Sequence, residues 1–363
     1  MTWTIGIFQT NTGEPQEFTN TITTATQSVI EVSAASWETR LTGQGRGRHT
    51  IPLFNQGISR TTIRELAKGN KYTIVQMWGD HVAYAGVIQR TRYDRSTRSL
   101  TVDSMELRGA YFNARMSTGV EAYDPGETVL TVTSKSHSGA ARIVVDAAMP
   151  NPEWELPIDL PADGSGAFSA SWQFEERLKI EDHLAQIEAD GCEIDFLPYL
   201  DGSGLLRWET RVATKITEGT ATAVEAVGSD SPVLDLEVSA DHAREMTGVL
   251  AFGKGGISAN VVTVGGLDIS VRDVWLNWPD ISDLTRLQAA ADAAFLELSE
   301  PTSQWSFGLH VFPDGPAFTA PGRLLTLSIS GDEFIPDGDH AMRVVALRGD
   351  LSNKVIPEVR DAA

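Results

Sequence analysis

Two stretches of apolar and polar residues in the first third of the chain have the patterns of β-strands. The β-rich stretch 73–88 is interrupted by the turn dipeptide Gly79-Asp80 and therefore predicts a hairpin. Residues 100–103 alternate again and predict a third strand. The period then changes to that of a helix over residues 105–116, so this region predicts a meander of strands followed by a helix.

The middle of the chain predicts two helices and a second hairpin. Residues 136–149 form a helical segment that Pro150 ends. A second helix is expected over residues 175–190, where Gly191 is placed as the C-terminal cap and the apolar positions are Ile180, Leu184 and Ile187. The period returns to two over residues 192–212, which predict a hairpin turning at Asp201-Gly202. Its inward face carries Cys192, Ile194 and Phe196, and Glu193 and Asp195 alternate with them.

The last third predicts more strands around one long helix. Helix 281–299 begins after a cap at Asp280 or Ser282 and ends at Pro301, and its apolar stripe is Ile281, Leu284, Leu287, Ala291, Phe295 and Leu298. The expected strands lie at 233–238, 249–252, 259–274, 305–312, 324–329 and 342–347. Together these elements predict an α+β, β-dominated protein with barrel-like parts and single inserted helices.

Composition excludes several classes of protein. The chain has 363 residues, of which 41% are hydrophobic and 21% charged, so it is globular rather than disordered. No apolar stretch reaches the roughly 18 residues of a membrane-spanning helix, and the first residues do not resemble a signal peptide. We therefore expect no membrane insertion by this chain. The single cysteine, Cys192, cannot form an internal disulfide, which is consistent with folding in a reducing cytoplasm.

Charge is distributed unevenly along the chain. Residues 1–116 hold 13 Lys and Arg against 9 Asp and Glu, a balance of +4, whereas residues 117–363 hold 16 against 40, a balance of −24. An acidic body of this kind repels nucleic acid and anionic lipid. A solvated acidic surface without a special role explains the same balance.

Two short patterns invite a catalytic interpretation and have simpler explanations. The stretch 248–255 is one residue short of a phosphate-binding loop, because Gly255 stands where a Ser or Thr is required, and a Gly-rich turn between strands is favoured. Cys192 lies close in sequence to His183, but its place on the inward face of a strand favours a buried structural thiol.

Neither metal binding nor hydrolysis has a specific signal. Asp201-Gly202, Asp314-Gly315 and Asp337-Gly338-Asp339 lack the ligand spacing of a calcium loop and are typical of turns, and the seven histidines show no zinc-binding spacing. Carboxylate pairs such as Glu175/Glu176 or Asp195/Glu209 are suitable for glycoside hydrolysis only if folding brings them together. The residues therefore predict no catalytic, cofactor-binding or metal-binding site.

A carbohydrate-binding or glycoside-hydrolysing protein remains the alternative function, and the nine Trp motivate it. Trp78, Trp208 and Trp305, however, fall in predicted strands, where packing in the core is common.

Three segments, taken in order, resemble the tail hub or minor tail proteins of long-tailed phages, especially phages of actinobacterial hosts and the N-terminal part of the tail-associated lysin type. The first runs from Trp78-Gly79-Asp80 to Arg115, and the second from Asp190-Gly191 through Trp208. The third runs from Ser282 to residues 343–345 and includes Ala320-Pro321-Gly322 and Pro336-Asp337-Gly338. The stretches 120–165 and 213–250 match least well.

The resemblance implies a homotrimer in which each chain supplies two β-barrel-like tube domains, so that six barrels form a ring around a channel. It places the tube domains at 1–116 and 236–363, with an α+β insert at 117–235. The implied location is the virion tail tip, and the implied partners are the distal tail protein or tail tube above and tip, fibre or receptor-binding proteins below. The tape measure protein and DNA would pass through an acidic lumen without specific binding. The family's hub portion is structural, so no residue is carried over as catalytic, and a lytic or adhesive activity is expected in a partner protein.

Overall fold

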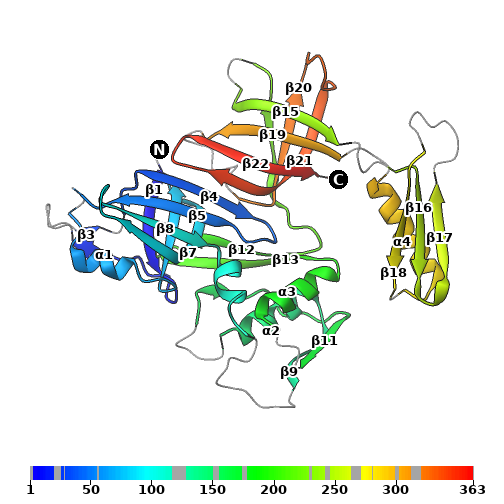
Figure 1. Ribbon diagram of the computed structural model, residues 1–363, viewed down its shortest axis with the longest axis horizontal. Helices are drawn as coiled ribbons and strands as arrows, with labels where there is room; N and C mark the ends of the chain where they lie inside the picture. Colours follow the sequence, from blue (N-terminus) through cyan, green and yellow to red (C-terminus); the bar gives the residue numbers. More distant parts are fainter. Residues whose placement is uncertain are drawn as a thin grey trace. The chain divides into compact units, whose positions relative to one another are not determined.

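The computed structural model describes residues 3–19, 26–27, 29–54, 57–116, 128–149, 155–173, 178–228, 231–241, 246–262, 271–279, 281–298, 302–311 and 320–362. These residues belong to two compact units, of which the first comprises 1–235 with 307–363 and the second comprises 236–306. Strands dominate both units (Figure 1). The β-dominated α+β class expected from the sequence is confirmed.

The first unit is built on one large sheet of twelve described strands. Its main path, in spatial order, is β1 (Trp3–Gln9), β6 (Tyr72–Trp78), β7 (His81–Asp94), β8 (Ser99–Met105), β5 (Arg46–Pro52), β4 (Ala34–Arg40), β21 (Gly338–Gly349), β22 (Lys354–Asp361), β19 (Thr302–His310) and β15 (Val233–Asp241). Two further strands join beside β21, namely β20 (Arg323–Ile329) and β14 (Glu218–Glu225), and a separate two-stranded pair is formed by β2 (Phe18–Thr19) and β3 (Thr26–Gln27). The path runs from β1 to β15 without closing, so the described strands form an open sheet rather than a closed barrel.

The predicted N-terminal meander is confirmed. β6 and β7 form an antiparallel hairpin whose turn contains Gly79 at φ +60°, a backbone conformation that favours glycine. β8 pairs with β7 on one side and with β5 on the other. One face of these strands is the interior of the unit, and α1 (Arg60–Leu66) packs on it through Ile63 and Leu66.

The predicted helix over residues 105–116 is much shorter than expected. Only one π-helical turn, η1 (Arg108–Phe112), forms there. Met105 is taken by β8, where it lies opposite Arg46, and Met116 forms a β-bridge with Lys179. Residues at both ends of the predicted helix therefore pair with strands, and only a single helical turn forms between them.

An α+β layer occupies residues 128–216 and covers part of the large sheet (Figure 1). Its helices are α2 (His137–Ala147) and α3 (Ile180–Ala189), and its strands are β9 (Thr128–Lys135), β10 (Ile158–Asp159), β11 (Phe168–Gln173), β12 (Glu193–Leu200) and β13 (Leu206–Ala213). Helix 136–149 and hairpin 192–212 are confirmed. The helix expected over 175–190 begins only at Ile180, because Lys179 is extended and forms a β-bridge with Met116. Trp208, Leu184 and Val144 belong to the same hydrophobic cluster as Val75 and Ala85 of the large sheet, so this layer and the sheet share one core.

The second unit is a small three-stranded sheet covered by a helix. Its elements are β16 (Gly248–Gly253), β17 (Ser258–Val262), β18 (Asp273–Trp278) and α4 (Leu284–Leu298). Leu287 and Ala291 of α4 pack on Val249 and Ala251 of β16, as the predicted apolar stripe requires. Leu284, by contrast, is exposed because it is the first residue of the helix.

The cap of this helix differs from the sequence expectation. The side chain of Asp283 accepts the N–H of Arg286 and acts as the N-cap, in place of Ser282. Asp280 and Pro301 lie outside the described residues. None of the helices in the described ranges is long and apolar enough to cross a membrane.

The N-terminal and C-terminal parts of the chain share the large sheet. β4 pairs with β21 over residues 37–40 and 346–349, and β21 also pairs with β20 and β22. The strands expected at 324–329 and 342–347 are confirmed as β20 and β21, while β22 has no counterpart in the prediction. The two parts expected to form separate tube domains are therefore continuous through hydrogen bonds between β4 and β21.

Candidate assembly surface

Cys192 and His183 are placed as structural residues. The Cys192 thiol is buried and donates a hydrogen bond to the carbonyl of Ile187 at 3.4 Å. Burial, with nearby acidic residues, raises the pKa of this thiol to about 11, so the reactive thiolate is disfavoured near neutral pH. His183 is fully buried and packs against Trp172 with ring centroids 4.3 Å apart. The prediction of a buried structural cysteine is confirmed.

The Gly-rich stretch 248–255 forms a turn between two strands, as predicted. β16 ends at Gly253, whose N–H donates to the carbonyl of Ile257, and β17 follows. Between the two strands lies a single 3-10 turn, Lys254–Gly256, and the glycines are followed by β17 rather than by an α-helix. Since a phosphate-binding loop holds its ligand at a helix N-terminus, this geometry does not support a nucleotide site.

The acidic-glycine clusters that fall in the described residues form turns. The Asp201 carboxylate accepts the N–H groups of Ser203 and Leu205, and the Asp337 carboxylate accepts the N–H of Gly331. Asp314-Gly315 lies outside the described residues. In the part of the chain that the structure describes, no three His, Cys, Asp or Glu side chains come together in a way that could hold a metal ion.

The carboxylates of Asp195 and Glu209 have different environments. Contrary to its predicted outward position, Asp195 is buried, and its carboxylate lies 2.5 Å from a guanidinium nitrogen of Arg211. Glu209 is exposed on β13. The ion pair occupies the carboxylate that a hydrolase would need as nucleophile or base, and the other candidate pair, Glu175/Glu176, lies outside the described residues.

The described tryptophans do not gather in one exposed groove. Trp78 and Trp208 are buried, as core packing predicts, and Trp305 is half-buried. Trp275 is the one described tryptophan that belongs to the exposed large hydrophobic residues. A sugar-binding platform of several aromatic rings is therefore not present among the described residues.

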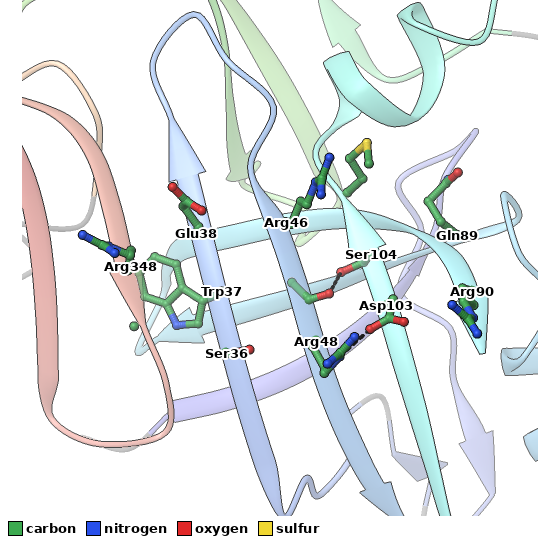
Figure 2. A pocket seen from close by; sticks show the side chains of 13 residues that line it. Ser36, Trp37, Glu38, Arg46, Arg48, Gln89, Arg90, Asp103, Ser104 and Arg348 are labelled. Atoms are coloured by element: carbon green, nitrogen blue, oxygen red, sulfur yellow. Dashed lines mark hydrogen bonds and ion pairs between the residues drawn. The ribbon is translucent and has the colours of Figure 1, made fainter. Parts of the chain in front are cut away.

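One open concave surface of the first unit is lined by arginines on the uncovered part of the large sheet (Figure 2). This open cavity has a volume of about 750 Å³. We call it the arginine face and define it by Arg46, Arg48, Arg90 and Arg348, with Glu38 and Asp103 between them.

Strand register explains why these side chains share one face. Asp103 of β8 lies directly opposite Arg48 of β5 and Arg90 of β7, and Arg348 of β21 lies opposite Glu38 of β4. Directly paired residues point to the same side of a sheet. Neighbouring strands lie about 4.8 Å apart, so the row from β7 to β21 spans about 19 Å.

Most of the positive charge of the arginine face is not neutralised within the described part of the chain. Arg48 donates to Asp103 at 2.6 Å, and Glu38 is paired with Arg40. The side chains of Arg46, Arg90 and Arg348 are exposed and make no hydrogen bond or ion pair with any described residue. Three free guanidinium groups thus border one cavity, an arrangement suited to an acidic partner.

Two glycines next to the arginines make room for buried aromatic rings on the inner side of the sheet, because residues that follow one another along a strand point to opposite sides. A Cβ at Gly47 would lie 2.6 Å from the ring of Tyr84, and a Cβ at Gly349 would lie 2.6 Å from the ring of Trp37. Any side chain at either position would displace a buried aromatic ring. On the arginine face itself the apolar side chain is that of Met105, which lies opposite Arg46.

A buried arginine, Arg108, joins the elements of the α+β layer to η1 beside the arginine face. The Arg108 guanidinium, 4% exposed, donates to the carboxylates of Glu181 and Glu188 at 2.6–3.0 Å and to the carbonyl of Ile194 at 2.9 Å. These contacts join η1 to α3 and β12. Burial raises the pKa of the Glu181 carboxyl even though Arg108 lies beside it.

A second buried pair joins the same layer to β21. Arg343 donates to both carboxylate oxygens of Glu193 at 2.6 and 2.7 Å, and to the carbonyl of Ile216 at 3.1 Å. Burial opposes ionisation of Glu193, but the two bonds from Arg343 outweigh it and lower the pKa of this carboxyl. Two-point contacts of this kind fix orientation as well as distance.

Glu106 anchors the β4–β5 turn next to the arginine face. Its carboxyl accepts the N–H of Gly45 at 2.5 Å and the hydroxyl of Thr39. Burial, with Asp195 nearby, raises the pKa of this carboxyl to about 8, so it is mostly protonated at neutral pH.

Sequence reasoning did not identify the arginine face. Its four arginines come from three strands, and β5 was not predicted. The one available signal is the spacing of Arg46 and Arg48, which places two cations on the same side of an extended segment. Nothing local indicates that Arg348 lies beside them.

Comparison with known proteins identifies the fold. No family model matches the chain, and no curated protein matches it. A tail protein from Neisseria meningitidis is similar with a TM-score of 0.59 and 13% identity, covering 100% of this chain and 97% of that chain. The 43 kDa tail protein of prophage MuSo2 from Shewanella oneidensis is similar with a TM-score of 0.60 and 10% identity, covering 99% of this chain and 98% of that one.

A component of the E. coli type VI secretion system, itself described as structurally similar to T4 tail proteins, is also similar. Its TM-score is 0.51 at 9% identity, and the match covers 92% of this chain and 74% of that chain. The chain thus has the fold of these tail proteins over its whole length.

Proposed function

We propose that this protein is a structural virion protein that forms a trimeric hub ring at the distal end of a phage tail tube. The observation that carries the proposal is the whole-length match to two tail proteins of nearly equal length, at 97% and 98% coverage of those chains. A match of this extent is expected when the entire chain serves one architectural role.

The architecture of the first unit supports an assembly role. The described strands form an open sheet rather than a closed barrel, and only short bridges to Pro15 and Val29 cover the outer edge of β1. Assemblies satisfy open sheet edges through neighbouring chains. In our proposal, 1–116 and 236–363 supply the tube domains around a channel, and 117–235 is the insert. The tube domains become barrel-like in the ring.

The proposed partners follow from this position. The distal tail protein or tail tube contacts the ring from above, and tip, fibre or receptor-binding proteins contact it from below. The tape measure protein and DNA pass through the lumen, and a chain with net charge −20 does not attract DNA by long-range electrostatics. An actinobacterial host remains a prediction from the sequence resemblance.

Imaging of particles tests this function. Purified virions should contain the protein, and class averages of a tagged variant should place extra density with threefold symmetry at the tail end. Particles that lack the protein, or that carry it in the capsid, would exclude the proposal. A deletion of its gene should yield host lysates without infectious tailed particles.

The carbohydrate alternative has its own test. Incubation of the purified chain with host cell wall should release no reducing sugar, because Asp195 is paired with Arg211 and the described tryptophans form no exposed platform. Release of sugar by the isolated chain would favour a glycoside hydrolase.

A further inference from the structure

The arginine face has a counterpart of opposite charge on the same chain. The loop between β20 and β21 spans residues 330–337, and with the first residues of β21 it carries Asp332, Glu333, Asp337 and Asp339. All four side chains are exposed, and residues 330–339 contain no Lys or Arg. We call this segment the acidic loop.

The tip of the acidic loop is an exposed aromatic ring. Phe334 is 81% exposed, more than any other large hydrophobic residue in the described part of the chain. The Asp332 carboxylate accepts the N–H groups of Phe334 and Ile335 at 2.8 and 2.7 Å, so the loop holds a defined shape. These bonds lower the pKa of Asp332 and keep it ionised. An ordered aromatic tip between carboxylates is a common form of interface anchor.

The acidic loop cannot reach the arginine face of its own chain. Gly338 begins β21 and Arg348 lies ten residues further along the same strand. A strand advances about 3.3 Å per residue, so about 33 Å of extended backbone separates the two surfaces. If they meet, they meet between two copies.

We propose that the arginine face of one copy binds the acidic loop of the next copy, and that this head-to-tail contact closes the ring. The proposal rests on the proposed hub function. The carboxylates pair with the free guanidinium groups of Arg46, Arg90 and Arg348, and the ring of Phe334 packs on the apolar side chain of Met105. The two surfaces differ and lie toward opposite ends of β21, so their contact is directional, and a directional contact produces a closed ring when the rotation between copies closes.

DNA is the competing occupant of the arginine face, and the charges favour protein. The face carries four arginines, but one is neutralised by Asp103 and a second acid, Glu38, lies among them. The chain as a whole carries −20, which repels a polyphosphate at long range. A short acidic loop experiences mainly the local charge, because screening removes interactions beyond about 10 Å at ordinary salt concentrations.

Charge exchange within the full-length chain tests the contact. The face variant is Arg90→Glu/Arg348→Glu, and both side chains are free and exposed. The loop variant is Glu333→Arg/Asp339→Arg, which leaves Asp332 and Asp337 to hold the loop. The control is Arg60→Glu/Arg64→Glu on α1, which has exposed arginines and packs on the opposite side of the sheet.

Self-association is measured by sedimentation velocity over a range of concentrations. Each variant should weaken self-association of the wild-type chain by at least about ten-fold, because like charges then face one another. The control should change it by less than about two-fold. The chain that combines the face and loop substitutions should recover most of the affinity, because every contact in its ring then pairs Glu with Arg in exchanged positions.

Recovery in the combined chain also excludes misfolding as the cause of each loss, and melting temperatures of all variants should agree. A wild-type chain that stays monomeric, variants that associate normally, or a combined chain that does not recover would each overturn the inference. Loss of binding to a short DNA duplex by the face variant, with self-association intact, would also overturn it and assign the face to nucleic acid. The particle images test the hub separately: a protein present at the tail tip with no response to charge exchange refutes only this contact.

Discussion

At the scale of single residues, charge is used in two ways in this protein. Exposed guanidinium groups such as Arg90 and Arg348 stay free on a sheet surface. Arg108, by contrast, is buried between two carboxylates, and Arg343 is buried against one. Free charges are available for recognition. Buried pairs set the orientation of the elements that carry them.

Glu106 is expected to make stability depend on pH. The pKa of this carboxyl is about 8 in the folded chain and lies above the ordinary value of 4.5. Between these two pH values the folded state holds a proton that the unfolded state has lost. This contribution to stability is fully present below about pH 4.5 and decreases as the pH rises through 8.

The Glu106→Gln variant should therefore become more stable than wild type with increasing pH. The difference in unfolding free energy should be small at pH 5 and grow by up to about 1.4 kcal/mol per pH unit until pH 8. Urea unfolding at several pH values measures it. A difference that is constant from pH 5 to pH 9 would show that the carboxyl ionises normally.

At the scale of elements, short pieces are positioned by their neighbours rather than by their own propensity. η1 is a single turn between two strand pairings, and its orientation depends on Arg108, which reaches α3 and β12. The same layer is held to β21 through Glu193. The arginine face therefore has a rigid border next to the part of the sheet that the layer covers.

Arg108→Met should destabilise the first unit by about 3–5 kcal/mol, because Glu181 and Glu188 would remain largely buried without their partner. Chemical unfolding followed by tryptophan fluorescence measures the loss. Adding Glu181→Gln and Glu188→Gln should restore much of the stability, since the uncompensated charges are then removed. A loss below about 1 kcal/mol would mean that water reaches this cluster.

At the scale of the whole molecule, the chain contains two units with separate cores. The cluster around Leu287 and Val249 belongs to the second unit, and the cluster around Leu184 and Trp208 belongs to the first. Separate cores allow one unit to open while the other stays folded.

Leu287→Ala should destabilise the second unit alone by about 2–5 kcal/mol, the cost of a cavity in a core. Hydrogen exchange read by mass spectrometry should accelerate in peptides from 246–262 and 284–298 and stay unchanged over 72–105. The matched variant Leu184→Ala, also fully buried, should give the reverse pattern. Acceleration in both units by either variant would indicate a single cooperative core.

The sequence by itself determined the elements whose pattern is local. The hairpin at β6 and β7, helices α2 and α4, and the hairpin of β12 and β13 were predictable because each depends on apolar spacing and turn residues within about twenty positions. The structural roles of Cys192 and of Trp78 follow from the same spacing, since an inward position on a strand implies burial.

Only the tertiary structure decided which distant segments meet. The pairing of β4 with β21, the burial of Asp195 beside Arg211, and the four arginines on one face join residues that are far apart in the chain. Such contacts leave no periodic signal, because a strand's edge can pair with many partners and a charge can be neutralised by any opposite charge that folding brings near. The shortened η1 has the same cause, since long-range strand pairing outweighed a local helical pattern.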